Sequence, residues 1–178
     1  MSRILIGLAS LNSVVLLMAF TVGFLSEGRA NLTPAGPLSA AQRMFTIHLI
    51  SGLSAALLTL LLHSLIFTYF IGTGRWVQEV VKAYQLPETF WRKSRTLKMQ
   101  ALPFILGSIL LVMTAAILGA ATDRGLLDRN IHLALAALAV GFNFWSYLAE
   151  YRAVVANSEL ITHIMDEVNR IRRERGLE

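Results

Sequence analysis

The chain has 178 residues, 55% of them hydrophobic, and a mean hydropathy of +0.58. It contains no cysteine, which excludes disulfides, thiolate metal sites, iron–sulfur clusters and cysteine nucleophiles. The formal net charge of +5 would indicate nucleic-acid binding in a soluble protein. Here the basic residues flank apolar runs and no nucleic-acid module accompanies them, so we expect no nucleic-acid partner.

Four long apolar runs dominate the chain, and each meets the requirement of about 20 apolar residues for crossing a bilayer. They lie between Arg3 and Glu27, Arg43 and Arg75, Lys98 and Asp123, and Arg129 and Glu150. The pattern predicts an all-α fold, an integral membrane four-helix bundle that occupies residues 1–153. We place the spans at about 4–25, 43–71, 101–121 and 131–151.

The first two spans have distinct boundary signals. A basic start and an apolar run are also typical of a cleaved signal peptide, but this run is longer than a usual signal core and no small-x-small site follows, which favours a retained helix. Residues Ser26 to Leu38 are expected to form a loop. Ser39 and Gln42 have capping-box spacing and should begin the second helix, which Gly72 and Gly74 are expected to end.

The connection from Arg75 to Gln100 carries an amphipathic segment before Pro87. It predicts a short interfacial helix between helices 2 and 3, with the third helix beginning near Ala101 and Pro103 in its first turn.

A second amphipathic segment follows the fourth span. Asp128 is the expected N-cap of the fourth helix. Residues 154–178 predict an amphipathic helical tail, because apolar residues recur there at three- and four-residue steps. Three arrangements stay open: the tail extends helix 4, lies on the membrane or packs on a partner.

The distribution of lysine and arginine predicts the orientation. One side of the bilayer collects Arg3, Arg75, Lys82, Arg92, Lys93, Arg95, Lys98, Arg152, Arg170, Arg172, Arg173 and Arg175, and the other only Arg29, Arg43, Arg124 and Arg129. The positive-inside rule then places both termini in the cytoplasm, and a bacterial-type inner membrane is favoured.

A short internal repeat marks the second and fourth helices. Ile47-His-Leu49 and Ile131-His-Leu133 open them, and His63 lies as far beyond His48 as Tyr147 lies beyond His132. Duplication of a two-helix unit would explain this match, and independent origin is the alternative.

The sharpest functional hypothesis concerns His48 and His132. Both helices run from outside to inside, so the two imidazoles are expected at similar depth. Gly52 and Ala136 leave room one turn away. We therefore predict haem b between helices 2 and 4, with the two histidines as axial iron ligands. The alternative is that each histidine hydrogen-bonds across the bundle or faces interfacial water.

A second polar group lies nearer the cytoplasmic ends of the same helices. His63, Tyr147 and Glu150 there suggest a proton-handling or quinone-headgroup site, and the alternative is that Glu150 simply sits among lipid headgroups.

The sequence leaves three functions open. The first is a non-enzymatic subunit of a membrane complex serving electron transfer, which would contact other membrane subunits or a second copy of itself. The second is a small transporter or proton-conducting protein that uses His63 and Glu150. The third is a scaffold that recruits a partner through its tail. The chain shows no P-loop, zinc-protease helix, nucleophile elbow or dinucleotide fingerprint.

Overall fold

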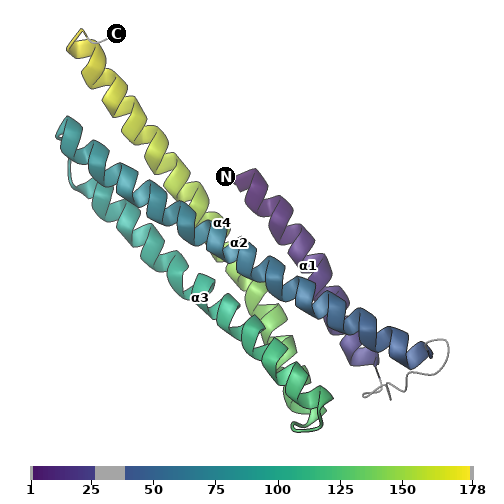
Figure 1. Cartoon of the computed structure of the whole chain (residues 1–178). Helices are drawn as coiled ribbons and strands as arrows, with labels where there is room; N and C mark the ends of the chain where they lie inside the picture. The colour runs from purple at the N-terminus through teal and green to yellow at the C-terminus, as the bar shows by residue number, and fades with distance from the viewer. Residues whose placement is uncertain (1, 27–38, 177–178) are drawn as a thin grey trace.

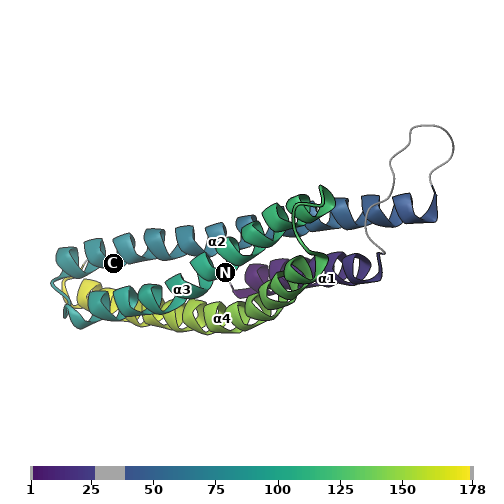
Figure 2. The same cartoon turned by 90° about the horizontal axis from the view of Figure 1, so that it is seen from below.

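The computed structural model describes residues 2–26 and 39–176, and this part of the chain folds into four helices and no strand. They are α1 (Ser2–Leu25), α2 (Ala40–Tyr84), α3 (Thr89–Asp123) and α4 (Arg129–Glu174). Figures 1 and 2 show them as one elongated bundle. The all-α prediction is therefore confirmed. The expected loop at 26–38 lies outside the described residues except for Ser26.

The four helices form a square arrangement in which α2 and α4 occupy one diagonal. α1 and α3 each pack against both α2 and α4, and within the described ranges α1 and α3 do not contact each other. Side chains that reach the centre of the bundle from α2 and α4 therefore meet across the diagonal. This is the place where helical bundles hold cofactors and polar sites.

All four helices are long and apolar enough to cross a membrane. Only 22–39% of the most apolar stretch of each is buried within the protein. Large apolar side chains point outward, among them Val14, Leu110 and Trp145, each about two-thirds exposed. An apolar surface this extensive is favourable against lipid and unfavourable against water, which supports a membrane-spanning bundle.

The expected end of the second helix at Gly72 and Gly74 is wrong. The Ser39–Gln42 capping box begins α2 as predicted, but the helix continues to Tyr84 and ends where Gln85 adopts a left-handed conformation (φ 54°). Each interior glycine costs about 1 kcal/mol relative to alanine. Burial of Val77 and Val81 beyond the glycines offsets that cost. The interfacial helix expected between helices 2 and 3 is consequently not a separate element, because its residues form the last turns of α2.

The third and fourth helices are also longer than expected. α3 begins at Thr89, so Pro103 lies in its interior, and α4 begins after the predicted N-cap Asp128 and continues to Glu174. Of the three arrangements open for the tail, the structure has the extension of helix 4.

The apolar face of that tail is covered within the chain. The end of α2, the start of α3 and the end of α4 continue past the N-terminus of α1 as what we call the three-helix extension (Figure 1). Its buried residues are Val77, Val81, Leu86, Leu160, Ile164 and Val168. The face that the scaffold hypothesis offers to a partner is thus packed inside the protein.

Burial follows the same intervals in the two halves of the chain. On α1 the buried residues are Leu5, Ala9, Asn12, Leu16 and Ala19, and on α3 the corresponding membrane-spanning set is Ala101, Ile105, Ser108, Val112 and Ala115. On α2 a buried series runs Ala55, Thr59, Leu62, His63, Ile66 and Phe70, and on α4 it runs Ala139, Asn143, Ser146, Tyr147, Glu150 and Val154. The α1–α2 and α3–α4 hairpins thus present equivalent faces to the centre, which favours the two-helix repeat.

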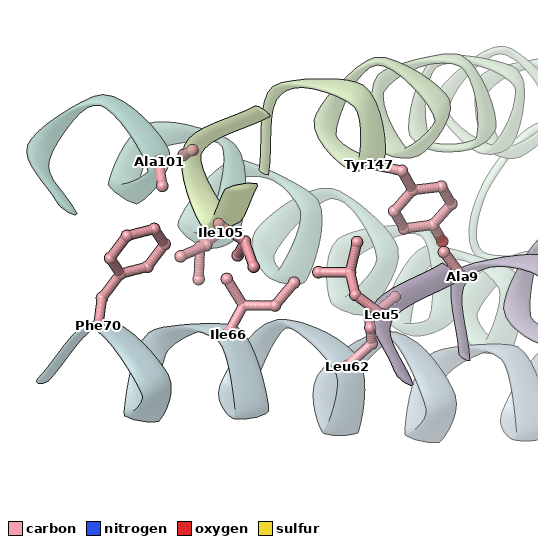
Figure 3. Close-up of a cluster of buried hydrophobic side chains, with 10 residues drawn as sticks. Leu5, Ala9, Leu62, Ile66, Phe70, Ala101, Ile105 and Tyr147 are labelled. Atoms are coloured by element: carbon pink, nitrogen blue, oxygen red, sulfur yellow. The ribbon is translucent and has the colours of Figure 1, made fainter. Parts of the chain in front are cut away.

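The core between these faces is visible in Figure 3. Leu62, Ile66 and Phe70 follow one side of α2 toward Ala101 and Ile105, while Tyr147 reaches from α4 toward α1. A tightly packed apolar layer therefore lies on the side of Tyr147 that leads to the three-helix extension.

The three-helix extension gives a test of how the end of α4 packs. Ile164 is fully buried, whereas its neighbour Met165 is 39% exposed. We expect Ile164→Ala to destabilise the protein by about 2–4 kcal/mol, because it leaves a cavity. Met165→Ala should change stability by less than about 0.5 kcal/mol. Thermal unfolding of purified protein in detergent measures both, and equal effects would contradict the packing of the tail.

Candidate functional site

His48 and His132 meet across the α2–α4 diagonal. Their ring centres lie 6.2 Å apart and the ring planes cross at 71°. His48 is the ninth residue of α2 and His132 the fourth of α4. Because the two rings are within contact distance, α2 begins further from them than α4 does. The structure thus brings together the two histidines that the sequence singled out.

Each imidazole lies against a glycine of the preceding helix. A Cβ atom on Gly23 would lie 2.5 Å from Cε1 of His48, and one on Gly119 would lie 2.9 Å from Cε1 of His132. Real atoms do not approach this closely, so neither position tolerates a side chain without displacement of the ring. The two glycines therefore set where the two imidazoles sit.

The backbone of α1 also orients His48. Its Nδ1 lies 3.0 Å from the carbonyl oxygen of Ala19. Because a carbonyl only accepts, Nδ1 carries a proton, and in the neutral ring the lone pair is then on Nε2. The carbonyl of Ala115 on α3 lies near the equivalent ring of His132, although the geometry falls short of a hydrogen bond and His132 Nδ1 is buried without a partner. Ala19 and Ala115 precede Gly23 and Gly119 by one turn in each hairpin, so the environment of the two rings repeats as well.

Two cavities adjoin the histidines. One has a volume of about 230 Å³ and the other about 200 Å³, and His48, His132, Phe20, Asp123 and Ala136 line both. Half of the residues that line the larger one are glycine or alanine, and they come from all four helices: Ala19, Gly52, Ala55, Ala115, Ala116, Gly119, Ala120, Ala136 and Ala139. Gly52 and Ala136, which the sequence placed beside the rings, therefore do line the space between them.

A second polar cluster occupies the centre of the bundle. His63 and Glu150 are fully buried, with Nδ1 2.8 Å from Oε1. Nε2 of His63 lies 3.2 Å from Oδ1 of Asn143, and the ring of Tyr147 stacks on His63 at 5.9 Å. The alternative that Glu150 lies among lipid headgroups is thus wrong, because its side chain has no exposed surface.

Asn12 extends this cluster to α1. Its amide nitrogen donates to Thr59 at 2.9 Å and to the hydroxyl of Tyr147 at 2.7 Å, and the hydroxyl in turn donates to Asn143 at 3.4 Å. Hydrogen bonds within apolar surroundings are strong because no water competes for them. Asn12, Thr59, His63, Asn143, Tyr147 and Glu150 are called the central polar network below.

Sequence reasoning missed two parts of these sites. Gly23 and Gly119 each follow an alanine by four residues, a spacing of small residues that is typical of close helix packing. Nothing in the sequence indicates that they face the histidines. Asn157 of α4 was also missed; it donates to Tyr69 and Thr73 at 3.1 Å each and accepts from Ser94 at 3.5 Å.

No known protein family matches the chain, and no curated protein or solved structure resembles it significantly.

The contact between glycine and imidazole can be tested by a single methyl group. We expect Gly23→Ala to lower stability by about 1–3 kcal/mol, because the added Cβ overlaps the His48 ring. Gly141→Ala is the matched control, since no atom lies within 4 Å of its Cβ position. It should be neutral or stabilising by up to about 1 kcal/mol. Thermal unfolding in detergent distinguishes the two, and a stable Gly23→Ala protein would contradict the close contact.

The buried pair can be tested by removing one partner and then both. We expect His63→Leu to destabilise the protein by about 3–5 kcal/mol, because Glu150 loses its partner in an apolar interior. The double variant His63→Leu/Glu150→Leu should recover most of that loss, because no ionisable group of the pair stays buried. Unfolding midpoints check this, and a double variant less stable than His63→Leu would overturn it.

Proposed function

We propose that the chain binds haem b between His48 and His132 and serves as a non-enzymatic electron-transfer subunit of a membrane complex. The spacing of the rings carries this proposal. Bonds from a metal to imidazole nitrogen are about 2.0 Å long, so two axial imidazoles have their nitrogens about 4 Å apart and their ring centres about 6 Å apart. The observed separation is 6.2 Å.

The hydrogen bond from His48 supports the same proposal. Histidines that ligate metals commonly donate their other N–H to a carbonyl or a carboxylate, which fixes the tautomer. The Nδ1–Ala19 contact does this for His48 and leaves Nε2 for iron. His132 has a buried Nδ1 without a partner, so its orientation would be set by the metal and by the contact with Gly119.

The surroundings suit a macrocycle better than a bare metal ion. The described residues hold no cluster of three or more His, Cys, Asp or Glu side chains that would bind a metal on their own. Two imidazoles complete the coordination of iron only if a porphyrin supplies four ligands. Small apolar walls match the flat apolar faces of haem.

The two cavities beside the histidines are small for a haem group. Each cavity is smaller than the roughly 300–1,000 Å³ of ordinary small-molecule sites. Haem would therefore occupy both cavities and project its edges between the helices, and Phe20, which lines both, would have to adopt another rotamer.

The distribution of basic residues orients this site. With both termini in the cytoplasm, the two histidines lie toward the outer leaflet and the three-helix extension lies in the cytoplasm. Electrons would reach or leave the haem through another subunit or a second copy of the chain.

A visible spectrum tests the proposal directly. Protein purified from haem-replete cells should show a Soret band and the sharp reduced bands of six-coordinate haem. His48→Ala and His132→Ala should each lose most of the bound haem, because each removes an axial ligand. His163→Ala is the control, since His163 lies on the three-helix extension against Phe90. Wild-type protein without a Soret band, or a band that survives in the double alanine variant, would refute the proposal.

Filling the cavity provides an independent test that leaves both ligands in place. Gly52 lines the larger cavity, whereas Gly72 is exposed on the same helix with no atom within 4 Å of its Cβ position. We expect Gly52→Leu to reduce haem occupancy by about tenfold or more, because steric overlap of about 1.4 kcal/mol suffices for that factor. Gly72→Leu should retain haem. The ratio of Soret to protein absorbance measures both, and full occupancy in Gly52→Leu would contradict binding in this cavity.

A further inference from the structure

The central polar network contains ionisable groups that the haem site does not use. Among the described residues, His63, Tyr147 and Glu150 are the only buried ionisable side chains. The buried residues of α1 and α3 are all non-ionisable: Leu5, Ala9, Asn12, Leu16, Ala19, Ser94, Ala101, Ile105, Ser108, Val112 and Ala115. An intramembrane ionisable pair is costly, and a bundle that needed only adhesion would use Asn, Ser and Thr, as it does elsewhere.

The hydrogen bonds fix how many protons the pair holds. Asn143 Nδ2 donates to the carbonyl of Ala139 at 2.8 Å, so its Oδ1 faces His63 as an acceptor and His63 Nε2 must carry a proton. The 2.8 Å contact between Nδ1 and Oε1 requires a second proton, on either the imidazole or the carboxyl. In both forms the pair is neutral overall, and its shared proton can move between the partners without a change in net charge.

The pair also has a vacant place for a further proton. Glu150 Oε2 is buried and has no hydrogen-bond partner. A proton there would give a neutral carboxyl beside a charged imidazolium. Within residues 2–26 and 39–176, the ionisable groups that interact with the carboxyl are His63 and Tyr147, so no fixed cation or carboxylate there prevents a change of charge.

A further cluster of polar side chains lies on the side of the pair that faces the three-helix extension. Asn157, two turns beyond Glu150 on α4, binds Tyr69, Thr73 and Ser94. In the other direction Ala55 and Ala139, one turn from Thr59 and Asn143, line the larger histidine cavity. Phe70 and Val154 are buried apolar residues between Glu150 and Asn157, so the arrangement favours slow proton exchange with water over continuous conduction across the membrane.

We propose that the His63–Glu150 pair is a proton-binding site whose proton affinity rises when the haem site gains one electron, so that the pair takes up a fraction of a proton from water. The reductant is a one-electron donor, and the pair returns that fraction to water when the electron leaves. The coupling rests on the proposed haem function, whereas proton binding by the pair does not.

The expected size of the coupling follows from distance. His48 and His63 are about 22 Å apart along α2 at 1.5 Å per residue. At an effective dielectric constant of about 20, removing one unit of positive charge at that distance raises proton affinity roughly three- to fourfold. For a one-electron couple this corresponds to a change of roughly 30 mV in the midpoint potential across the titration.

The first measurement needs no haem. Infrared difference spectra of the full chain in lipid nanodiscs, recorded over a pH series, should contain carboxyl and imidazole bands that disappear in Glu150→Gln. Glu159→Gln is the control, because Glu159 is exposed on the same helix. The variant His63→Leu/Glu150→Leu serves if Glu150→Gln does not fold. Wild-type spectra with no component that depends on Glu150 would overturn proton binding.

The second measurement is a redox titration of haem-loaded protein at several pH values, with dithionite as the reductant. The wild type and Glu159→Gln should show the pH-dependent potential, and Glu150→Gln should lose it while its Soret band is unchanged. The same pH dependence in Glu150→Gln would overturn the coupling. If no haem binds, the proposed function fails in the visible spectrum, and the infrared series still decides whether the pair binds a proton.

Discussion

The constraint on which this structure depends is that every polar group inside an apolar bundle must find its partner within the protein. Lipid offers no hydrogen bonds, so His63 and Glu150 are stable at the centre only because they bind each other and Asn143. Because His63 and Glu150 must face each other, the rotation of α2 and α4 about their axes is fixed. The same rotation turns His48 and His132 inward, since they lie on the same stripes of these helices.

The two-helix repeat explains why the histidines meet. Equivalent buried faces on the two hairpins relate α1 to α3 and α2 to α4, and residues at equivalent positions on α2 and α4 approach each other at the centre. His48 with Gly23 and His132 with Gly119 are such equivalent pairs. The correspondence ends one level deeper, where Tyr147 is the counterpart of His63 and Ile66 is the counterpart of Glu150. At the first level the two facing residues are both histidine. At the second level the facing residues differ, and His63 and Glu150 share a hydrogen bond.

The two levels divide the bundle into regions with different chemistry. The histidine level has open space and few hydrogen bonds, which is what a bound group requires. The central polar network is tightly packed and almost fully hydrogen-bonded, with Asn12 Oδ1 and Glu150 Oε2 as its buried atoms without partners. The cavity lined by the two histidines thus lies at a different level of the bundle from the buried ionisable pair.

The sequence by itself determined the membrane class, the four spans, the capping box at Ser39, the N-cap at Asp128 and the two polar stripes, because hydropathy, helical periodicity and capping are local properties. It did not determine that α2 continues through Gly72 and Gly74. Local propensity favours a stop there, and the burial of Val77 and Val81 in the core of the three-helix extension offsets the cost. Nor did it show that Glu150 is buried or that Gly23 and Gly119 touch the imidazoles. Those facts depend on which helices lie along the diagonal and how each is rotated, and only packing among all four helices decides both.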